Sequence, residues 1–383
     1  MFKFTNTLKG ASVLTIAAVM ATTAAHAQDG ADLGISDADY SLDALIEAAQ
    51  QEGPITVIDA TGQIVNMAEA FTEKYGIEAV GVRMSAQEQE QILVREAAAN
   101  NVQTDVFNMS NLPSITSSLL PQGIVVSWFP PDFADVIAPE HQSPALTSHN
   151  PWLWAYNSDV HPDGCPVDNM WALTEPEWAG KVAFPDPQLR NETIFWFNQM
   201  ETNSDEQMAQ AYEAYFGEPL ETEEASATAE WVKRFAGNNP TIARGDSDVG
   251  PIVGASTEDD SRIGFLSTAI FRHAERDGYN MAVCEGMQPF VGQLAPRVAV
   301  IAAGTQHPNA AKLFARFMMT EEGMLPQLQD GKISTNADAN MPEMERSGVI
   351  NLVDQLHMAD AATADSDFAR LQDWQDFWIV NSR

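Results

Sequence analysis

One loop of the sequence combines a cation, a carboxylate and a helix start, which together suit anion binding. Residues 185–193 follow a strand-like segment, 181–184, and open a predicted helix. The free N–H groups at a helix N-terminus, together with the guanidinium of Arg190, could bind a phosphate, phosphonate or carboxylate. Asp186 lies in the same loop. We therefore predict a binding site for an anionic group here.

Other roles for the residues of this loop remain open. Arg190 could instead pair with Glu192 or another acid on the surface. Asn191 and Thr193 could be helix caps only, because Asn and Thr side chains often accept hydrogen bonds from the first turn of a helix. We keep both as candidate ligand-binding residues.

An alternating aromatic segment is a second candidate. Trp152, Trp154 and Tyr156 occupy every second position of an extended stretch, so all three should face one side of a strand. A tryptophan can stack on a ring or cover a cation, and we expect one of Trp152 and Trp154 to line the cleft, with Trp154 as the candidate ligand contact. The alternative is that this face belongs to the core.

Acidic loops allow the opposite kind of ligand. Asp246 and Asp248 are close in sequence, and residues 258–260 are all acidic. Such carboxylates could bind a polyamine or a thiamine-like cation, although blocks of acid usually face water. The spacing does not match a calcium loop, and we predict neither a metal site nor a cofactor.

The two cysteines, Cys165 and Cys284, are predicted to form a disulfide, because an even number in an exported chain is typically paired. Neither belongs to a C-x-x-C, and His161 is a lone candidate ligand nearby, so a metal site there is disfavoured. Hydrolase, zincin, P-loop and dinucleotide-binding motifs are absent, so we expect no enzymatic activity.

Alternating helix and strand signals position these residues. The order predicts an α/β fold of two lobes, each with a parallel sheet flanked by helices. Residues 148–156 and 289–301 are extended and apolar, and they are predicted to cross between the lobes. An acidic, helix-prone tail begins near residue 341. The predicted helices are 42–51, 67–75, 86–99, 191–200, 225–236 and 309–319, and the predicted strands are 55–58, 79–82, 105–108, 181–184 and 263–266.

The N-terminus predicts export. Lys3 and Lys9 precede an apolar run, 11–19, and the segment ends in Ala25-His26-Ala27, which is typical of a cleaved signal peptide. Without the two lysines, 18 basic and 54 acidic residues leave a formal charge of −36. Such a charge excludes nucleic acid and anionic lipid as natural partners, because both would be repelled.

Three segments carry a family resemblance. The opening of the mature chain, the stretch Ala172-Leu-Thr-Glu-Pro-Glu-Trp-Ala-Gly-Lys-Val-Ala-Phe-Pro-Asp-Pro187, and residues 298–323 resemble family 1 extracellular solute-binding proteins of ABC importers, in their ferric-iron-like branch. The resemblance covers nearly the whole mature chain. It implies a type II periplasmic binding protein with a signal peptide at 1–27, a first lobe at 28–150 plus 290–340, a second lobe at 151–289, and a C-terminal helical segment at 341–383 that packs on the lobes.

The same resemblance indicates where a ligand would bind. Iron-binding members hold ferric ion with a tyrosine pair, often aided by a histidine and an acid, but the matching positions here carry none of these groups. They carry hydroxyls, amides and glycine, which suit an organic ligand. These candidate ligand-binding residues are Thr61, Gly62, Gln63, Asn108, Ser110, Ser267 and Thr268.

The resemblance therefore implies a periplasmic monomer that closes on a small organic solute and delivers it to an inner-membrane permease. Our expectation is an anionic solute, with ferric iron or a cation such as a polyamine or thiamine as the alternative. A periplasmic enzyme built on the same lobes is the last alternative. A protein that presents its bound ligand to a membrane sensor, and not to a permease, would show the same sequence features.

Overall fold

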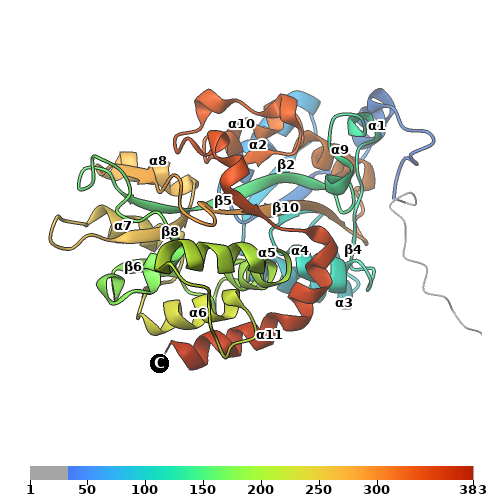
Figure 1. Cartoon of the computed structure of the whole chain (residues 1–383). Helices are drawn as coiled ribbons and strands as arrows, with labels where there is room; N and C mark the ends of the chain where they lie inside the picture. Colours follow the sequence, from blue (N-terminus) through green and yellow to red (C-terminus); the bar gives the residue numbers. More distant parts are fainter. Residues whose placement is uncertain (1–32, 383) are drawn as a thin grey trace, which may run out of the picture.

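The computed structural model describes residues 33–382, so the predicted signal peptide lies outside the described residues. Figure 1 shows two α/β lobes side by side, with helices packed around a strongly twisted sheet. The predicted fold class, two α/β lobes joined by two crossing strands, is confirmed. Within residues 33–382, no helix has the length and apolar character that a membrane span requires.

The first lobe is built on three parallel strands in the order β2-β1-β3. Helices connect these strands, as the βαβαβ pattern predicts. Gly76 ends α2 in the left-handed conformation (φ 70°), as a C-cap glycine does. The elements of this lobe are α1 (Leu42–Ala49), β1 (Ile55–Asp59), α2 (Ile64–Tyr75), β2 (Ala79–Arg83), α3 (Ala86–Ala98), β3 (Val106–Met109), α4 (Leu112–Ser114), β4 (Val125–Val126), α9 (Pro308–Phe317) and α10 (Glu321–Leu328).

The second lobe repeats this arrangement with the parallel strands β8-β6-β7. Its first helix is longer than the predicted 191–200, because it continues through a break at Ser204 (φ −145°) to Phe216. The elements are β6 (Val182–Pro185), α5 (Asn191–Phe216), α6 (Ala227–Gly237), β7 (Thr241–Ala243), α7 (Asp246–Gly254), β8 (Ile263–Ser267), α8 (Ala269–Asp277) and β9 (Met281–Val283).

Two long strands run through both lobes. β5 (Leu146–Asn157) and β10 (Gly292–Ala302) pair with each other in antiparallel register, with Asn150 opposite Ala295. β10 also pairs with β3 of the first lobe, and β5 with β8 of the second. The short strands β11 (Ile333–Ser334) and β12 (Leu356–Met358) add to β5 and β10. The predicted crossings thus form one continuous floor between the lobes.

The tail differs from a simple helical segment. Short 3-10 turns and β12 precede its one long helix, α11 (Ala364–Asn381). Trp374 and Trp378 of α11 are buried in the core of the second lobe, while Ala364 packs in a core of the first lobe. One helix therefore contacts both lobes, and it lies along the bottom of Figure 1.

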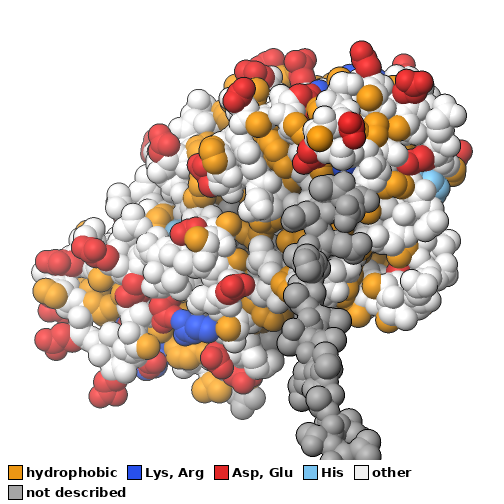
Figure 2. All heavy atoms as spheres, turned by 90° about the vertical axis from the view of Figure 1, so that its right-hand side faces the viewer, with side chains coloured by type: hydrophobic (Ala, Val, Ile, Leu, Met, Phe, Trp, Pro, Cys, Tyr) orange, Lys and Arg blue, Asp and Glu red, His pale blue; other side chains and the backbone are white. Residues whose placement is uncertain are grey.

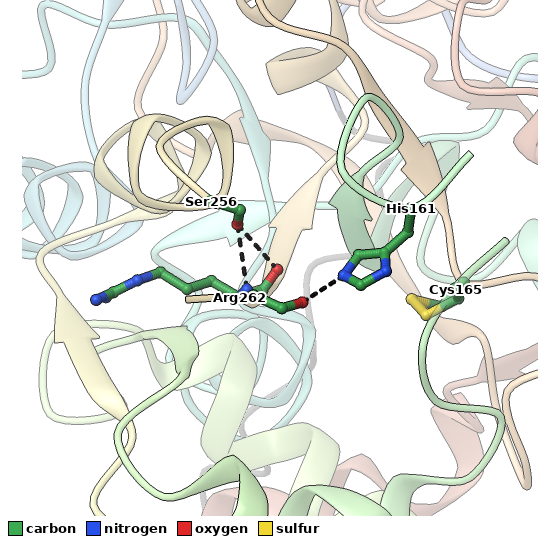
Figure 3. The surroundings of a disulfide bond; sticks show 6 residues. His161, Cys165, Ser256 and Arg262 are labelled. Carbon is green, nitrogen blue, oxygen red and sulfur yellow. Dashed lines mark hydrogen bonds between the residues drawn. A yellow bond between two sulfur atoms is a disulfide. The ribbon is translucent and has the colours of Figure 1, made fainter. Parts of the chain in front are cut away.

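The predicted disulfide between Cys165 and Cys284 is confirmed. It joins positions 119 residues apart, and both cysteines contact the core of the second lobe. Figure 3 shows His161 beside Cys165, where a ring nitrogen of His161 hydrogen-bonds the hydroxyl of Ser261 at 2.5 Å. The imidazole of His161 therefore has Ser261 as its hydrogen-bond partner near the disulfide.

Candidate functional site

A cavity of about 390 Å³ lies between the two lobes. Its walls come from loops and helix starts of both lobes, and its floor comes from the crossing strands. This volume suits a solute the size of a small metabolite. The cavity is lined by Ala60, Thr61, Gly62, Gln63, Asn66, Arg83, Ser110, Asn150, Trp152, Arg190, Glu192, Asp246, Ser247, Ser267, Ala269, Ile270, Arg272, His273, Ala295, Arg297, Asp330 and Lys332.

The floor carries a buried cation, Arg297 of β10. Its Nη2 donates to Asp59 Oδ1 and, at 2.9 Å, to the carbonyl of Asn108. Asp59 is completely buried, and its Oδ2 also accepts from Asn108 Nδ2 at 2.7 Å and from Gln327 Nε2 at 3.1 Å. Burial lowers the pKa of Arg297 to about 10, which still leaves it charged at neutral pH. The Arg297–Asp59 pair therefore ties β10 to β1 beneath the cavity.

A second buried cation, Lys332, stands beside this pair. It precedes β11, and its ammonium donates to Asn150 Oδ1 on the floor. The residue is only 7% exposed. Burial, followed by repulsion from Arg297, lowers the pKa of Lys332 to about 8. Two like charges thus lie side by side at the bottom of the cavity.

Four helices begin at the cavity, α2 from the first lobe and α5, α7 and α8 from the second. Their N-cap residues are Gln63, Arg190, Gly245 and Thr268, and none of these side chains caps its helix. The helix dipoles make each such end favourable for negative charge, although Glu192 and Asp246 already occupy the first turns of α5 and α7. The converging ends therefore add positive potential to the cavity.

The three carboxylates of the cavity have protein partners. Glu192 Oε1 accepts a hydrogen bond from Ser110 Oγ across the cleft at 2.7 Å, and Asp246 accepts one from Ser267. Asp330 forms an ion pair with Arg272 at 2.9 Å. These acids are therefore engaged within the protein.

The charge of the cavity is opposite to that of the chain. The lining contains five Arg and Lys side chains and three carboxylates, while the whole chain has a formal charge of −34. Burial lowers the pKa of His273, which favours its neutral form. Figure 2 shows acidic side chains scattered over the outer face, with few basic ones. Positive charge is thus concentrated where a ligand would enter.

Six of the predicted site residues line this cavity and six lie elsewhere. Asn108 lies behind the floor, where it contacts Asp59, and Thr268 donates to the carbonyl of Asp330 at 2.8 Å. Asp186 accepts from the backbone N–H of Gln188. The residues at the cavity are Thr61, Gly62, Gln63, Ser110, Arg190 and Ser267, and those away from it are Asn108, Trp154, Asp186, Asn191, Thr193 and Thr268.

Trp154 lies in the core of the second lobe, and Trp152 is the tryptophan that lines the cavity. Both side chains are on one face of β5, as the alternation predicts. However, that face passes under the second lobe, where the ring of Trp154 packs 6.4 Å from that of Trp196 on α5. Asn191 and Thr193 also face protein, since Asn191 accepts from Gln375 and Thr193 is buried.

Four cations of the cavity were not predicted from the sequence. Arg297 had a detectable signal, because a charged residue interrupts an otherwise apolar strand. Lys332 lies in the short loop after α10, and its sequence context gave no comparable signal. Arg83 and Arg272 lie at the end of β2 and in α8, where a surface position is the usual expectation. The four missed residues are Arg83, Arg272, Arg297 and Lys332.

The acidic runs lie in different places. Asp246 is at the cavity, whereas Glu258 and Asp259 line a separate hollow in the second lobe. Within residues 33–382, no group of three His, Cys, Asp or Glu side chains is arranged to hold a metal ion.

The family model for bacterial extracellular solute-binding proteins matches residues 66–348. Among solved structures, iron-bound HitA from Pseudomonas aeruginosa is similar with a TM-score of 0.61 and 15% identity, over 87% of this chain and 100% of that one. The periplasmic binding protein AfuA from Actinobacillus pleuropneumoniae, with fructose-6-phosphate bound, gives a TM-score of 0.63 and 17% identity, over 86% and 99%.

The substrate-binding protein of an ABC transporter from Agrobacterium tumefaciens gives a TM-score of 0.64 and 11% identity, over 88% of this chain and 97% of that one. At such identities these matches establish the fold, that of a type II periplasmic binding protein. Among curated protein sequences, none matches this chain.

Proposed function

The chain belongs to the bacterial extracellular solute-binding proteins, the substrate-binding components of ABC importers, and we propose that it captures a small organic anion in the periplasm. In this proposal the two lobes close around the solute, and the monomer delivers it to an inner-membrane permease without chemical change. A hinged cleft suits this task because closure excludes water and strengthens short polar contacts.

One observation supports an anion above other solutes, namely the surplus of positive charge in the cavity of an acidic protein. Five cationic side chains line it, and four helices begin there without side-chain caps. The anionic group could be a phosphate, a phosphonate or a carboxylate, since each accepts hydrogen bonds from such donors. Uncharged contacts to the remainder would come from Thr61, Gly62, Gln63, Ser110 and Ser267.

The side chains of the cavity match a cationic ligand less well than an anionic one. Each cavity carboxylate already accepts a hydrogen bond or forms an ion pair, so a polyamine, thiamine or ferric ion would have to replace those partners. It would also approach the buried charges of Arg297 and Lys332.

A thermal-shift screen tests the proposal, because a ligand that binds the native state raises its melting temperature. The panel should contain sugar phosphates, phosphonates, carboxylates, thiamine, polyamines and ferric salts. We expect the largest stabilisation from an anionic organic compound. Stabilisation by ferric salts or cations alone would contradict the proposal.

The hydrogen bond between Ser110 and Glu192 joins the lobes, so it should favour closure. Replacing Ser110 with alanine should weaken binding of the best ligand about fivefold, since one hydrogen bond contributes about 1 kcal/mol. Isothermal titration calorimetry measures this change. The melting temperature of the ligand-free variant should fall by no more than about 2 °C, and an unchanged affinity would exclude a role for this contact in closure.

A further inference from the structure

We propose that Lys332 selects for an anionic ligand by donating hydrogen bonds directly to the anionic group, with Arg297 beside it on the cavity floor. This inference rests on the proposed function and goes further, because it assigns the anionic group to the floor of the cavity and not to the loop that carries Arg190. It also makes Lys332 the residue that distinguishes charged from neutral solutes.

The first support is the incomplete bonding of the Lys332 ammonium. An ammonium has three N–H donors. Asn150 Oδ1 accepts one hydrogen bond, and no other acceptor contacts Nζ within the described residues. No carboxylate of residues 33–382 forms an ion pair with Lys332, although the residue is 7% exposed. The remaining donors therefore lack a protein partner at a site that opens to the cavity.

The groups around Lys332 include no ion-pair partner among residues 33–382. Arg297 of β10 repels it. Asp330 and Asp246 attract it from a distance; Asp330 pairs with Arg272, and Asp246 keeps its charge while it accepts from Ser267. Two further groups belong to its surroundings: Asn150 of β5 is neutral, and the Glu345 carboxylate lines a small hollow together with Lys332, where one of its oxygens accepts from Ser347 and the other has no hydrogen-bond partner.

A buried cation without a charged partner destabilises the protein that holds it. Proteins retain such groups where a ligand supplies the missing charge, at the expense of stability. Removing the charge of Lys332 should therefore affect the empty and the loaded protein in opposite directions. A merely structural lysine would not behave this way, because its loss would destabilise both forms.

Binding should also depend on pH. The pKa of Lys332 in the empty cavity is about 8, and a bound anion raises it because the charged form gains a partner. Above pH 8 the neutral amine of Lys332 must take up a proton when the anion binds. Affinity should then be highest below pH 8 and fall by up to about tenfold per pH unit above it.

The test compares Lys332→Met with wild type, using inorganic phosphate and fructose 6-phosphate as probes. The ligand-free variant should melt about 2 °C higher than wild type, because a buried charge is gone. Its affinity for the anion that wild type binds should be about 10–100-fold weaker. Lys332→Gln, which keeps a donor for Asn150, should show the same loss of affinity, and the fall above pH 8 should disappear in both variants.

Lys233→Met is the matched control, because Lys233 pairs with Glu224 on the surface at 2.6 Å. It should change neither quantity. If Lys332→Met binds the anion as tightly as wild type, or if its ligand-free form melts lower, the inference is overturned while the proposed function stands. If wild type binds only spermidine, thiamine or ferric citrate, the proposed function falls and the inference with it.

Discussion

Replacing Arg297 with methionine should lower the free energy of unfolding by about 3–5 kcal/mol, because Asp59 would remain buried without its cation. Asp59 is completely buried and Arg297 is 4% exposed, so water cannot replace the lost partner without opening the floor. The Arg297 guanidinium also binds the carbonyl of Asn108. Urea denaturation of the ligand-free protein measures the loss.

The double variant Asp59→Asn with Arg297→Met shows how much of this loss comes from the unpaired charge of Asp59 and how much from the missing packing of the Arg297 side chain. It should recover most of the stability, because no unpaired charge remains in the floor. Anion binding should stay weak in it, since the cavity has lost a cation. If Arg297→Met were as stable as wild type, the buried pair would not hold β10 to β1 as described.

Loss of the disulfide should lower the free energy of unfolding by a similar amount. Exchange of Cys165 and Cys284 for serine should destabilise the protein by about 4–5 kcal/mol, because the bridge closes a loop of more than a hundred residues in the unfolded chain. The two cysteines are 119 positions apart in sequence. Differential scanning calorimetry of the oxidised, reduced and double-serine proteins measures the change.

Ligand affinity should survive this change almost intact. Both cysteines contact the core of the second lobe, and neither lines the cavity. The reduced wild type should behave like the double-serine variant. A tenfold or larger loss of affinity on reduction would mean that the bridge positions cavity residues.

The fold could be predicted from local signals that agree with the tertiary structure. Met67 and Phe71 are buried on one face of α2, as helical spacing predicts, and Gly76 ends that helix. The apolar crossings, 148–156 and 289–301, became β5 and β10 because strands shared by two lobes are buried on both faces. Residues 61–63, which the family resemblance singled out as candidates, line the cavity.

The distinction between core and cavity could not be predicted. Trp152 and Trp154 have the same residue type and strand face, and only the position of α5 over Trp154 separates them. Asn108 lies in β3, where its amide donates to Asp59 behind the floor, whereas Ser110 directly after the strand lines the cavity. Whether such a side chain is buried or lines the cavity depends on which distant segment of the chain packs against it. Residue spacing along the sequence does not encode this long-range contact.

The positions of the charged side chains in the fold could not be predicted from the sequence either. A composition of 54 acidic and 20 basic residues describes the surface but gives no indication that five of the cations meet in one cavity. Lys332 reaches the floor only because β11 pairs with β5, a contact between residues nearly two hundred positions apart.

The central claim is that the cleft binds a small organic anion. Native mass spectrometry tests it without a choice of ligand, after the ligand-free protein is equilibrated with a small-molecule extract of bacterial cells and washed. The expected result is a one-to-one adduct that is released as an organic anion and is much less abundant in Lys332→Met. An adduct of ferric ion, thiamine or a polyamine would contradict it.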